Sequence, residues 1–209
     1  MAEQASAALG EAKRQAVVDH VLVSARKYVL ANGLDATMDD LAEATGVSRR
    51  TLFRHFTTRE KLLAAAFDAG MVNYREQLPT YAGNLHDWLR ATCEQAHRMN
   101  STIGPGFFDL ASRSDLPPDL AAVERRRRNE FREAMNQTAH ILWTGAGGRG
   151  RTPRTVSGAV SAHLSPHFTA ALMIDAGESW KVAADLAFAA ILATVEREAA
   201  HDKSRRQKG

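Results

Sequence analysis

Between Val47 and Lys61 the sequence places five basic residues against a single acid, Glu60. Five positive charges and one negative charge give this stretch a formal balance of +4, whereas the whole 209-residue chain carries +3. The basic residues are Arg49, Arg50, Arg54, Arg59 and Lys61. The guanidinium group of arginine presents paired N–H donors that fit O6 and N7 of guanine, and both basic types bind phosphate oxygens. These side chains therefore indicate recognition of a nucleic acid, provided that the fold holds them on one surface.

A short helix through Leu52 and Phe56 would hold the arginines on the surface. The two apolar residues stand four apart in the sequence, so both face the protein interior when this segment is helical. The arginines of the same segment must then point away from the core. Ser48 precedes the segment and is of a type that caps a helix N-terminus.

A second short helix is expected directly before this one. Thr37, with Asp40 three residues later, resembles a capping box, and Met38 and Leu41 form an inward face. Gly46 breaks the pattern between the two helices. Two helices joined by a tight turn are the layout of a helix-turn-helix unit, whose second helix enters the DNA major groove. The other interpretation of the arginines is a solvated helix face without a partner.

The segment "TMDDLAEATGVSRRTLFRHFTTREKLLAAAF" resembles the N-terminal signature of the TetR family of one-component bacterial transcriptional regulators. The resemblance runs from about Val21 to Phe67, and the rest of the chain is similar to the family only in length and in number of helices. It implies a homodimer that binds double-stranded operator DNA with its two helix-turn-helix units in successive major grooves. It also implies a repressor whose larger domain binds a small-molecule effector that releases the DNA.

The resemblance also implies which residues contact DNA. Base contacts fall on the start of the second helix, and phosphate contacts fall on Thr37, His55 and Arg59. The complete predicted interface is Thr37, Ser48, Arg49, Arg50, Thr51, Phe53, Arg54, His55 and Arg59. Two positions depart from the family. Phe53 stands where a tyrosine hydroxyl commonly touches a phosphate, and Asp39 stands where a basic residue can occur.

Helical spacing recurs along almost the whole chain, so the sequence predicts an all-α fold of about nine helices. We expect a helix-turn-helix DNA-binding domain at residues 12–57, a larger ligand-binding and dimerisation domain at 58–201, and a disordered basic tail at 202–209. An apolar stripe from Val156 to Leu172 predicts one unbroken eighth helix. The eighth helix and the ninth, which contains "VAADLAFAAILA", carry small residues that allow close packing, and under the resemblance they form the homodimer interface.

The larger domain is expected to bind a small apolar or aromatic effector. Residues on inward helix faces should line its pocket, and packing in an ordinary core is the alternative for each of them. The candidates are Tyr74, Trp88, Cys93, His97, Phe107, Phe108, Phe131, Met135, His163, His167 and Phe168. The last two histidines stand four apart, a spacing that can chelate zinc, but no nearby Cys or Glu completes a site. We therefore expect no metal and no cofactor.

The remaining sequence features favour a cytoplasmic protein without a membrane partner. Cys93 is the single cysteine, so no internal disulfide is possible. The chain has no long apolar run for a membrane span, and its start, "MAEQASAALGEAKRQ", lacks the apolar core of a secretory signal.

Two other classes of function remain open at this point. One is an enzyme built in a helical bundle, but the sequence contains no G-x-S-x-G or H-E-x-x-H pattern, and we do not expect an enzyme. The other is a regulator-like protein that has lost DNA binding and acts through protein partners, which the departures at Phe53 and Asp39 leave open.

Overall fold

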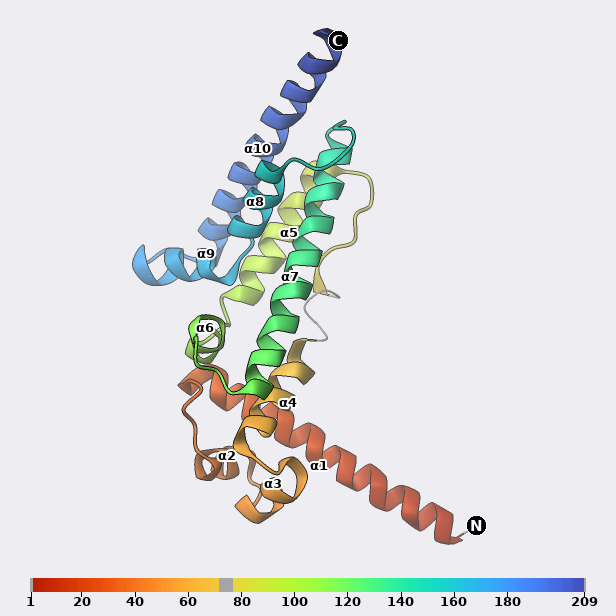
Figure 1. Ribbon diagram of the computed structural model, residues 1–209, viewed down its shortest axis with the longest axis vertical. Helices are drawn as coiled ribbons and strands as arrows, with labels where there is room; N and C mark the ends of the chain where they lie inside the picture. The colour runs from red at the N-terminus through yellow and green to blue at the C-terminus, as the bar shows by residue number, and fades with distance from the viewer. Residues whose placement is uncertain (1, 72–76, 209) are drawn as a thin grey trace. The chain divides into compact units, whose positions relative to one another are not determined.

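The computed structural model describes residues 2–71 and 77–208, and all regular structure within these ranges is helical (Figure 1). The all-α fold class is therefore confirmed. The helices are α1 (Ala2–Asn32), α2 (Met38–Thr45), α3 (Arg49–Phe56), α4 (Arg59–Met71), α5 (Leu85–Asn100), α6 (Pro105–Ser112), α7 (Pro118–Gly145), α8 (Arg154–His163), α9 (Pro166–Ala170) and α10 (Trp180–Lys208). A π-helical turn, η2 (Ala171–Asp175), follows α9 directly. None of the described helices is long and apolar enough to cross a membrane.

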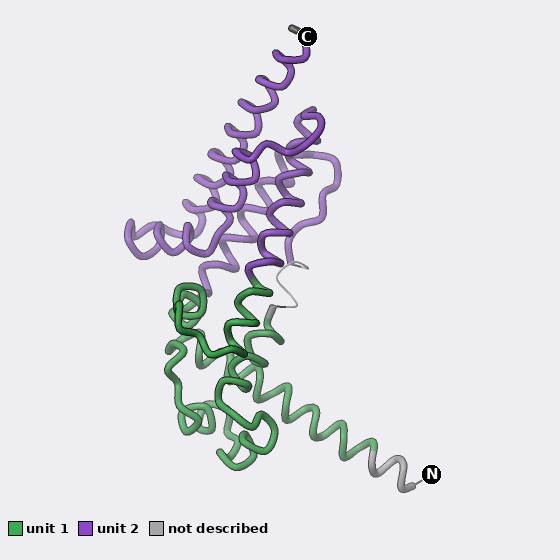
Figure 2. Tube along the Cα trace, in the orientation of Figure 1, with its two compact units in different colours: residues 1–73, 104–127 green, residues 74–103, 128–209 purple. Residues whose placement is uncertain are grey.

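The chain divides into two compact units, and each contains two segments of the sequence (Figure 2). Unit 1 comprises residues 1–73 and 104–127, and unit 2 comprises residues 74–103 and 128–209. These units differ from the expected domains at 12–57 and 58–201, because α4, α6 and the first turns of α7 belong to unit 1. Sequence order alone predicted a boundary directly after the helix-turn-helix.

Unit 1 is built around α1. Val21, Ala25 and Val29 form one face of this helix and are all buried, and α2, α4 and α6 pack against α1. Gly106 of α6 lies directly on the α1 backbone, since a Cβ added there would stand 2.0 Å from the Val29 carbonyl oxygen. The absence of a side chain at Gly106 therefore permits the close approach of α6 to α1.

Unit 2 is a helical bundle in which α5 and α8 pack against α10. Its core contains apolar residues from four helices: Leu89 and Cys93 of α5, Met135 and Leu142 of α7, Val156 and Val160 of α8, and Ala187, Ile191 and Val195 of α10. Leu186, on α10, lies outside this core and is 47% exposed.

The prediction of one unbroken eighth helix is wrong. Helix α8 ends at His163, and α9 begins at Pro166. Ser165 caps the new helix by accepting a hydrogen bond from the Phe168 N–H at 3.2 Å. Pro166 then occupies the first helical position, where its missing N–H costs nothing. His163 and His167 therefore lie on different helices, and the zinc-chelating spacing inferred for them does not exist.

The expected disorder of residues 202–209 is also not observed over the described part, because α10 continues to Lys208. Asp202 and Arg206, one helical turn apart, form an ion pair at 2.7 Å. Arg206 Nη2 also donates to the Gly147 carbonyl at 3.2 Å, which ties this end of α10 to the glycine-rich loop after α7.

Candidate nucleic-acid interface and ligand pocket

Helix α2 begins with a complete capping box. The Thr37 hydroxyl accepts from the Asp40 N–H at 3.2 Å, and the Thr37 N–H donates to Asp40 Oδ2 at 2.7 Å. The backbone N–H of Thr37 and, to a smaller extent, its hydroxyl, which also donates to Asp40 Oδ2 at 2.7 Å, lower the pKa of the Asp40 carboxyl. The predicted capping box is thus confirmed, and the Thr37 side chain, expected at a phosphate, has a structural partner.

A tight turn joins α2 to α3. Gly46 has φ +66°, the left-handed conformation that glycine adopts without strain, and its N–H bonds the carbonyls of Ala42 and Glu43. Ser48 then caps α3 by accepting from the Thr51 N–H at 3.3 Å. On the inner side of α3, Leu52 is fully buried, so the helix is anchored from below, as its sequence predicts.

Arg49 projects from the first turn of α3 and is held by Asp39 of α2. Its Nη1 donates to both carboxylate oxygens, at 2.9 and 3.1 Å, and both side chains are largely exposed. The guanidinium carbon also lies 5.5 Å from the centre of the Phe53 ring, which is 38% exposed. Asp39, which departs from the basic residue that can occur at this position in the family, therefore fixes Arg49, one of the predicted base-contacting residues.

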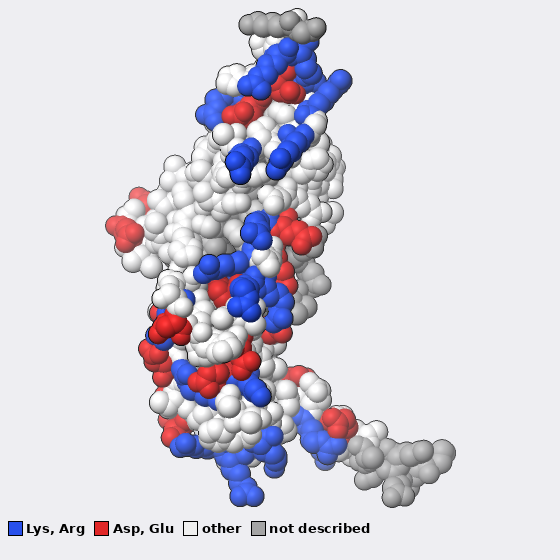
Figure 3. Space-filling view, in the orientation of Figure 1, with Lys and Arg blue, Asp and Glu red and all other residues white. Residues whose placement is uncertain are grey.

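Arg50 and Arg54 are exposed, and within the described ranges neither has an ion-pair or hydrogen-bond partner. Lys61, at the start of α4, is exposed as well. Figure 3 shows basic side chains gathered at the end of unit 1 that carries α3. Four of the five predicted basic residues, Arg49 included, are thus presented to solvent.

Arg59 is the exception, and its predicted contact with a phosphate is not supported. Its Nε donates to the Ala36 carbonyl, and its Nη2 donates to the Leu34 carbonyl. Its third nitrogen, Nη1, lies 3.0 Å from Glu60 Oε1. All three nitrogens thus bind acceptors of the same chain, and Arg59 fixes the segment that leads into α2.

The remaining predicted interface residues occupy α3. The hydroxyls of Ser48 and Thr51 lie 3.0 Å apart and bond each other at the helix start. His55 is half-buried beside Phe56, with ring centroids 6.3 Å apart. Thr57, which ends the helix, has φ +65°, a strained conformation for a β-branched residue. The structure thus places every predicted DNA contact of this helix on one short element or its caps.

Unit 2 contains a pocket of about 220 Å³ beside α5 and α7. Trp88 and Tyr81 meet edge to face at 5.3 Å, and the Trp88 indole N–H donates to the Pro79 carbonyl at 2.9 Å. The buried Thr92 Oγ1 has no hydrogen-bond partner among the described residues. The ten lining residues that the structure describes include no charged side chain: Leu78, Pro79, Thr80, Tyr81, Trp88, Thr92, Ala134, Gln137, Thr138 and Ile141. This chemistry suits a neutral molecule with an aromatic part and one polar group.

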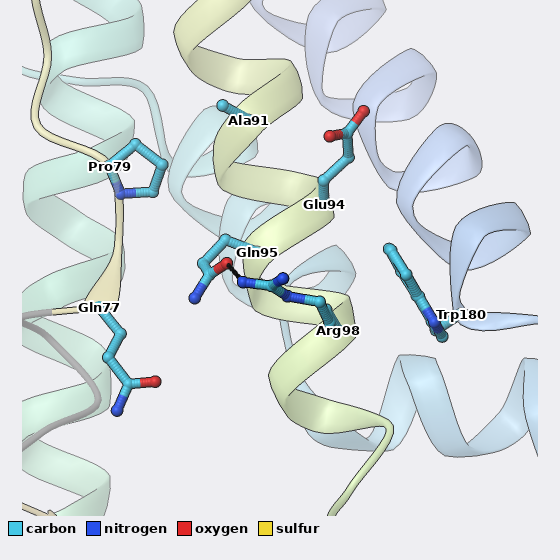
Figure 4. A pocket seen from close by; sticks show the side chains of 7 residues that line it. All are labelled: Gln77, Pro79, Ala91, Glu94, Gln95, Arg98 and Trp180. Carbon is cyan, nitrogen blue, oxygen red and sulfur yellow. Dashed lines mark hydrogen bonds between the residues drawn. The ribbon is translucent and has the colours of Figure 1, made fainter.

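A second pocket, of about 390 Å³, is lined by residues of the segment before α5, of α5 itself and by Trp180 of α10 (Figure 4). Pro79 lines both pockets. The second pocket is polar and includes exposed charges of α5: its lining is Gln77, Pro79, Ala91, Glu94, Gln95, Arg98 and Trp180. Two of these lining residues, Gln95 and Arg98 of α5, are hydrogen-bonded to each other.

Of the predicted ligand-binding residues, only Trp88 lines either pocket. Cys93, His97 and Met135 are fully buried in the packed core. Phe131 and Phe168 are half-buried against that core, His163 is half-buried, and His167 is exposed. Phe107 and Phe108 belong to α6 in unit 1, and Tyr74 lies outside the described residues. Sequence reasoning missed Thr92, Gln137 and Thr138, whose polar groups interrupt apolar helix faces.

His97 belongs to a buried polar cluster next to α9. Its Nδ1 lies 2.8 Å from Thr169 Oγ1, which also accepts from Asn100 Nδ2 at 3.2 Å. Burial lowers the pKa of His97 to about 4; the nearby His163 carbonyl opposes this effect in part but completes no hydrogen bond with Nε2. The imidazole is therefore neutral at physiological pH. In the described part of the chain, no group of three or more His, Cys, Asp or Glu residues could hold a metal ion.

Comparison with known proteins agrees with this arrangement. Residues 21–66 match the model of the bacterial regulatory proteins of the tetR family. A solved chain from Rhodococcus sp., assigned to the TetR family of transcriptional regulators, has a TM-score of 0.65 at 17% identity over 86% of this chain and 98% of its own. NalD, the secondary repressor of the MexAB-OprM multidrug efflux pump in Pseudomonas aeruginosa, has a TM-score of 0.56 at 18% identity over 87% of this chain and 96% of its own. No curated protein matches the sequence significantly.

The similarity to regulatory proteins is thus confined to the helix-turn-helix segment, and the solved chains share the all-α fold. Residues 21–66 match the tetR family model, and the chain as a whole shares the fold of the two solved chains.

Proposed function

We propose that this protein is an effector-responsive repressor that binds operator DNA through α3. The observation that carries this proposal is the exposure of Arg49, Arg50 and Arg54 on a helix anchored by the buried Leu52. Outward arginines at the start of a second helix match the geometry by which helix-turn-helix proteins contact base edges. The absence of an internal partner leaves the Arg50 guanidinium available for guanine.

Selection from a pool of duplexes with a randomised centre tests this proposal. The wild-type chain should enrich one sequence. Arg50→Ala should reduce the free energy of discrimination between bases at one position of that sequence by about 1–3 kcal/mol. Lys61→Ala is the control. Removing a lysine that contacts phosphate should weaken binding to cognate and random duplexes by the same amount. If the wild-type chain enriches no sequence, a regulator that acts through protein partners becomes the better description.

The effector site that we assign to this regulator is the 220 Å³ pocket. Its volume lies below the usual range of about 300–1,000 Å³, so the effector is compact. Its described lining is uncharged and favours a neutral ligand, and the Tyr81 and Trp88 rings favour an aromatic one. Thr92 borders this pocket, and rotation of its side chain would turn its buried, unpartnered hydroxyl toward the polar group of that ligand.

Indole and benzoate are suitable probes, because both are compact and aromatic but only benzoate is charged. Indole should change the fluorescence of the wild-type chain on titration and should lower its affinity for the selected duplex, whereas benzoate should do neither. Thr92→Val should weaken indole binding by about three- to tenfold, the equivalent of one hydrogen bond. Binding of indole that is unchanged in this variant would show that the site lies elsewhere.

The homodimer interface that we propose consists of the outward faces of α8 and α10. These two helices pack against each other in unit 2, and their exposed positions carry small or apolar residues: Gly158 and Ala162 on α8, and Leu186, Ala189 and Ala193 on α10. Leu186→Glu should convert dimer to monomer in light-scattering measurements. Val23→Glu, at an exposed valine of α1 in unit 1, should leave the mass unchanged.

A further inference from the structure

We propose that Asp39 is a positioning residue that presents Arg49 to one base of the operator. This inference rests on the proposed DNA binding and adds a residue that lies outside the predicted contact set. It is unexpected on charge alone, because a carboxylate on a DNA-binding surface repels the phosphates. The Asp39 carboxylate therefore needs a role that offsets its repulsion of the phosphates.

The hydrogen-bond geometry supplies that role. Both carboxylate oxygens of Asp39 accept from the single nitrogen Nη1 of Arg49, at 2.9 and 3.1 Å. Nε and Nη2 have no partner among the described residues, and together they form one complete edge of the guanidinium fork. A two-donor edge is what guanine O6 and N7 require. Asp39 thus holds the side chain while leaving this edge unoccupied.

One further contact restricts the guanidinium group. Arg49 is the first residue of α3, and Phe53, one turn later, places its ring 5.5 Å from the guanidinium carbon. Asp39 is itself fixed near the start of α2, where the neighbouring Asp40 and Thr37 form the capping box. Arg49 is therefore restrained by α2 on one side and by its own helix on the other.

Arg50 provides the internal comparison. It is the next residue of α3 and is exposed, yet no carboxylate restrains it in the described structure. Restraining an arginine before binding reduces the conformational entropy that is lost when it bonds a base. Asp39 should thus raise discrimination at the base contacted by Arg49 and lower affinity for DNA of any sequence.

The test compares Asp39→Asn with Glu43→Gln in the full-length chain. Glu43 is an exposed acid of the same helix without a side-chain partner in the described structure, so its variant matches the change in charge. Each variant is titrated with the selected duplex, with duplexes changed at single positions, and with random duplex. Asp39→Asn should lose about two- to fivefold of its discrimination at one position, as expected for an exposed ion pair, and should bind random duplex more tightly. Glu43→Gln should keep full discrimination, and thermal unfolding confirms that both variants are folded.

A double-variant experiment separates positioning from charge. In an Arg49→Ala background, Asp39→Asn should change no discrimination, whereas in an Arg50→Ala background it should still remove the two- to fivefold. Undiminished discrimination in Asp39→Asn, an equal loss in Glu43→Gln, or a loss that persists without Arg49 would each overturn the role of Asp39 while leaving DNA binding intact. Failure of the wild-type chain to enrich any duplex would instead refute both proposals.

Discussion

The two units of this protein treat their polar groups in opposite ways. Around α2 and α3 of unit 1, several polar side chains bond one another or nearby carbonyls, as in the Thr37–Asp40 cap and the Arg59 contacts. In unit 2, by contrast, α5 carries all three buried side-chain polar atoms that lack a hydrogen-bond partner in the described residues: Thr92 Oγ1, His97 Nε2 and Asn100 Oδ1. Under the proposed function, the surface of α3 that meets DNA gains from preformed geometry, whereas the interior beside the proposed effector pocket gains from unsatisfied groups.

The largest expected effect tests the close packing of unit 1. Gly106→Ala should lower the free energy of unfolding by about 3 kcal/mol, the upper end of overpacking, because the new methyl group would overlap the Val29 carbonyl. Chemical denaturation followed by circular dichroism measures it. Gly10→Ala, on α1 with no atom within 4 Å of the added Cβ, should instead stabilise the chain slightly through helix propensity. Equal effects of the two variants would contradict the proposed role of the α1–α6 contact.

The second effect probes the unsatisfied interior of unit 2. His97 has a pKa of about 4 when folded and an ordinary value of 6.5, so between these pH values the unfolded chain binds a proton that the folded chain does not. Its contribution to stability is therefore complete above pH 6.5 and is lost as the pH falls towards 4, by about 3 kcal/mol in total. Denaturation at several pH values should show this loss in the wild-type chain.

The matched variants are His97→Gln and His201→Gln. The first should flatten the pH dependence between 6.5 and 4, because glutamine takes up no proton in either state. The second replaces an exposed histidine of α10 and should leave the wild-type profile unchanged. If the free energy of unfolding of His97→Gln still falls steeply between pH 6.5 and 4, a group other than His97 takes up the proton.

The third effect returns to unit 1. Arg59→Ala should cost about 1–3 kcal/mol of stability, because it leaves the carbonyls of Leu34 and Ala36 without their charged donor. Lys61→Ala, two residues later and exposed, should change stability by less than about 0.5 kcal/mol. The two variants also differ on DNA: after correction for unfolded protein, Arg59→Ala should keep the wild-type salt dependence. A flatter salt dependence for Arg59→Ala would restore the phosphate contact that the sequence suggested.

The helix-turn-helix could be predicted from the sequence because its signals are local. Thr37 and Asp40 form a cap across three residues, Gly46 makes the turn, and Leu52 and Phe56 define one face of α3. The role of Arg59 could not be read in this way, because it depends on carbonyls more than twenty residues away. The same limit applies to the Arg49–Asp39 pair, where the fold brings together charges ten residues apart.

The residues that line the 220 Å³ pocket could not be read from the sequence for a related reason. Apolar stripes identify residues that face inward, but only the packing of several helices decides which of them border a cavity. Cys93 and Met135 therefore proved to be core, whereas Thr92 lines the pocket. The break between α8 and α9 had a local signal in Ser165 and Pro166, which the continuous apolar stripe outweighed.

The smallest expected effect has the opposite sign and sharpens the contrast between the units. Thr92→Val replaces a buried hydroxyl that has no partner with a methyl group of the same shape. It should raise the free energy of unfolding by about 1 kcal/mol, because the cost of keeping that hydroxyl away from water disappears. Thr45→Val is the matched control in unit 1, where the buried hydroxyl donates to the Leu41 carbonyl at 2.7 Å, and it should lower stability. If the two substitutions change the free energy of unfolding in opposite directions, α5 keeps a destabilising hydroxyl at the proposed effector site. If Thr92→Val instead lowers stability, the Thr92 hydroxyl already has a hydrogen-bond partner in the free protein.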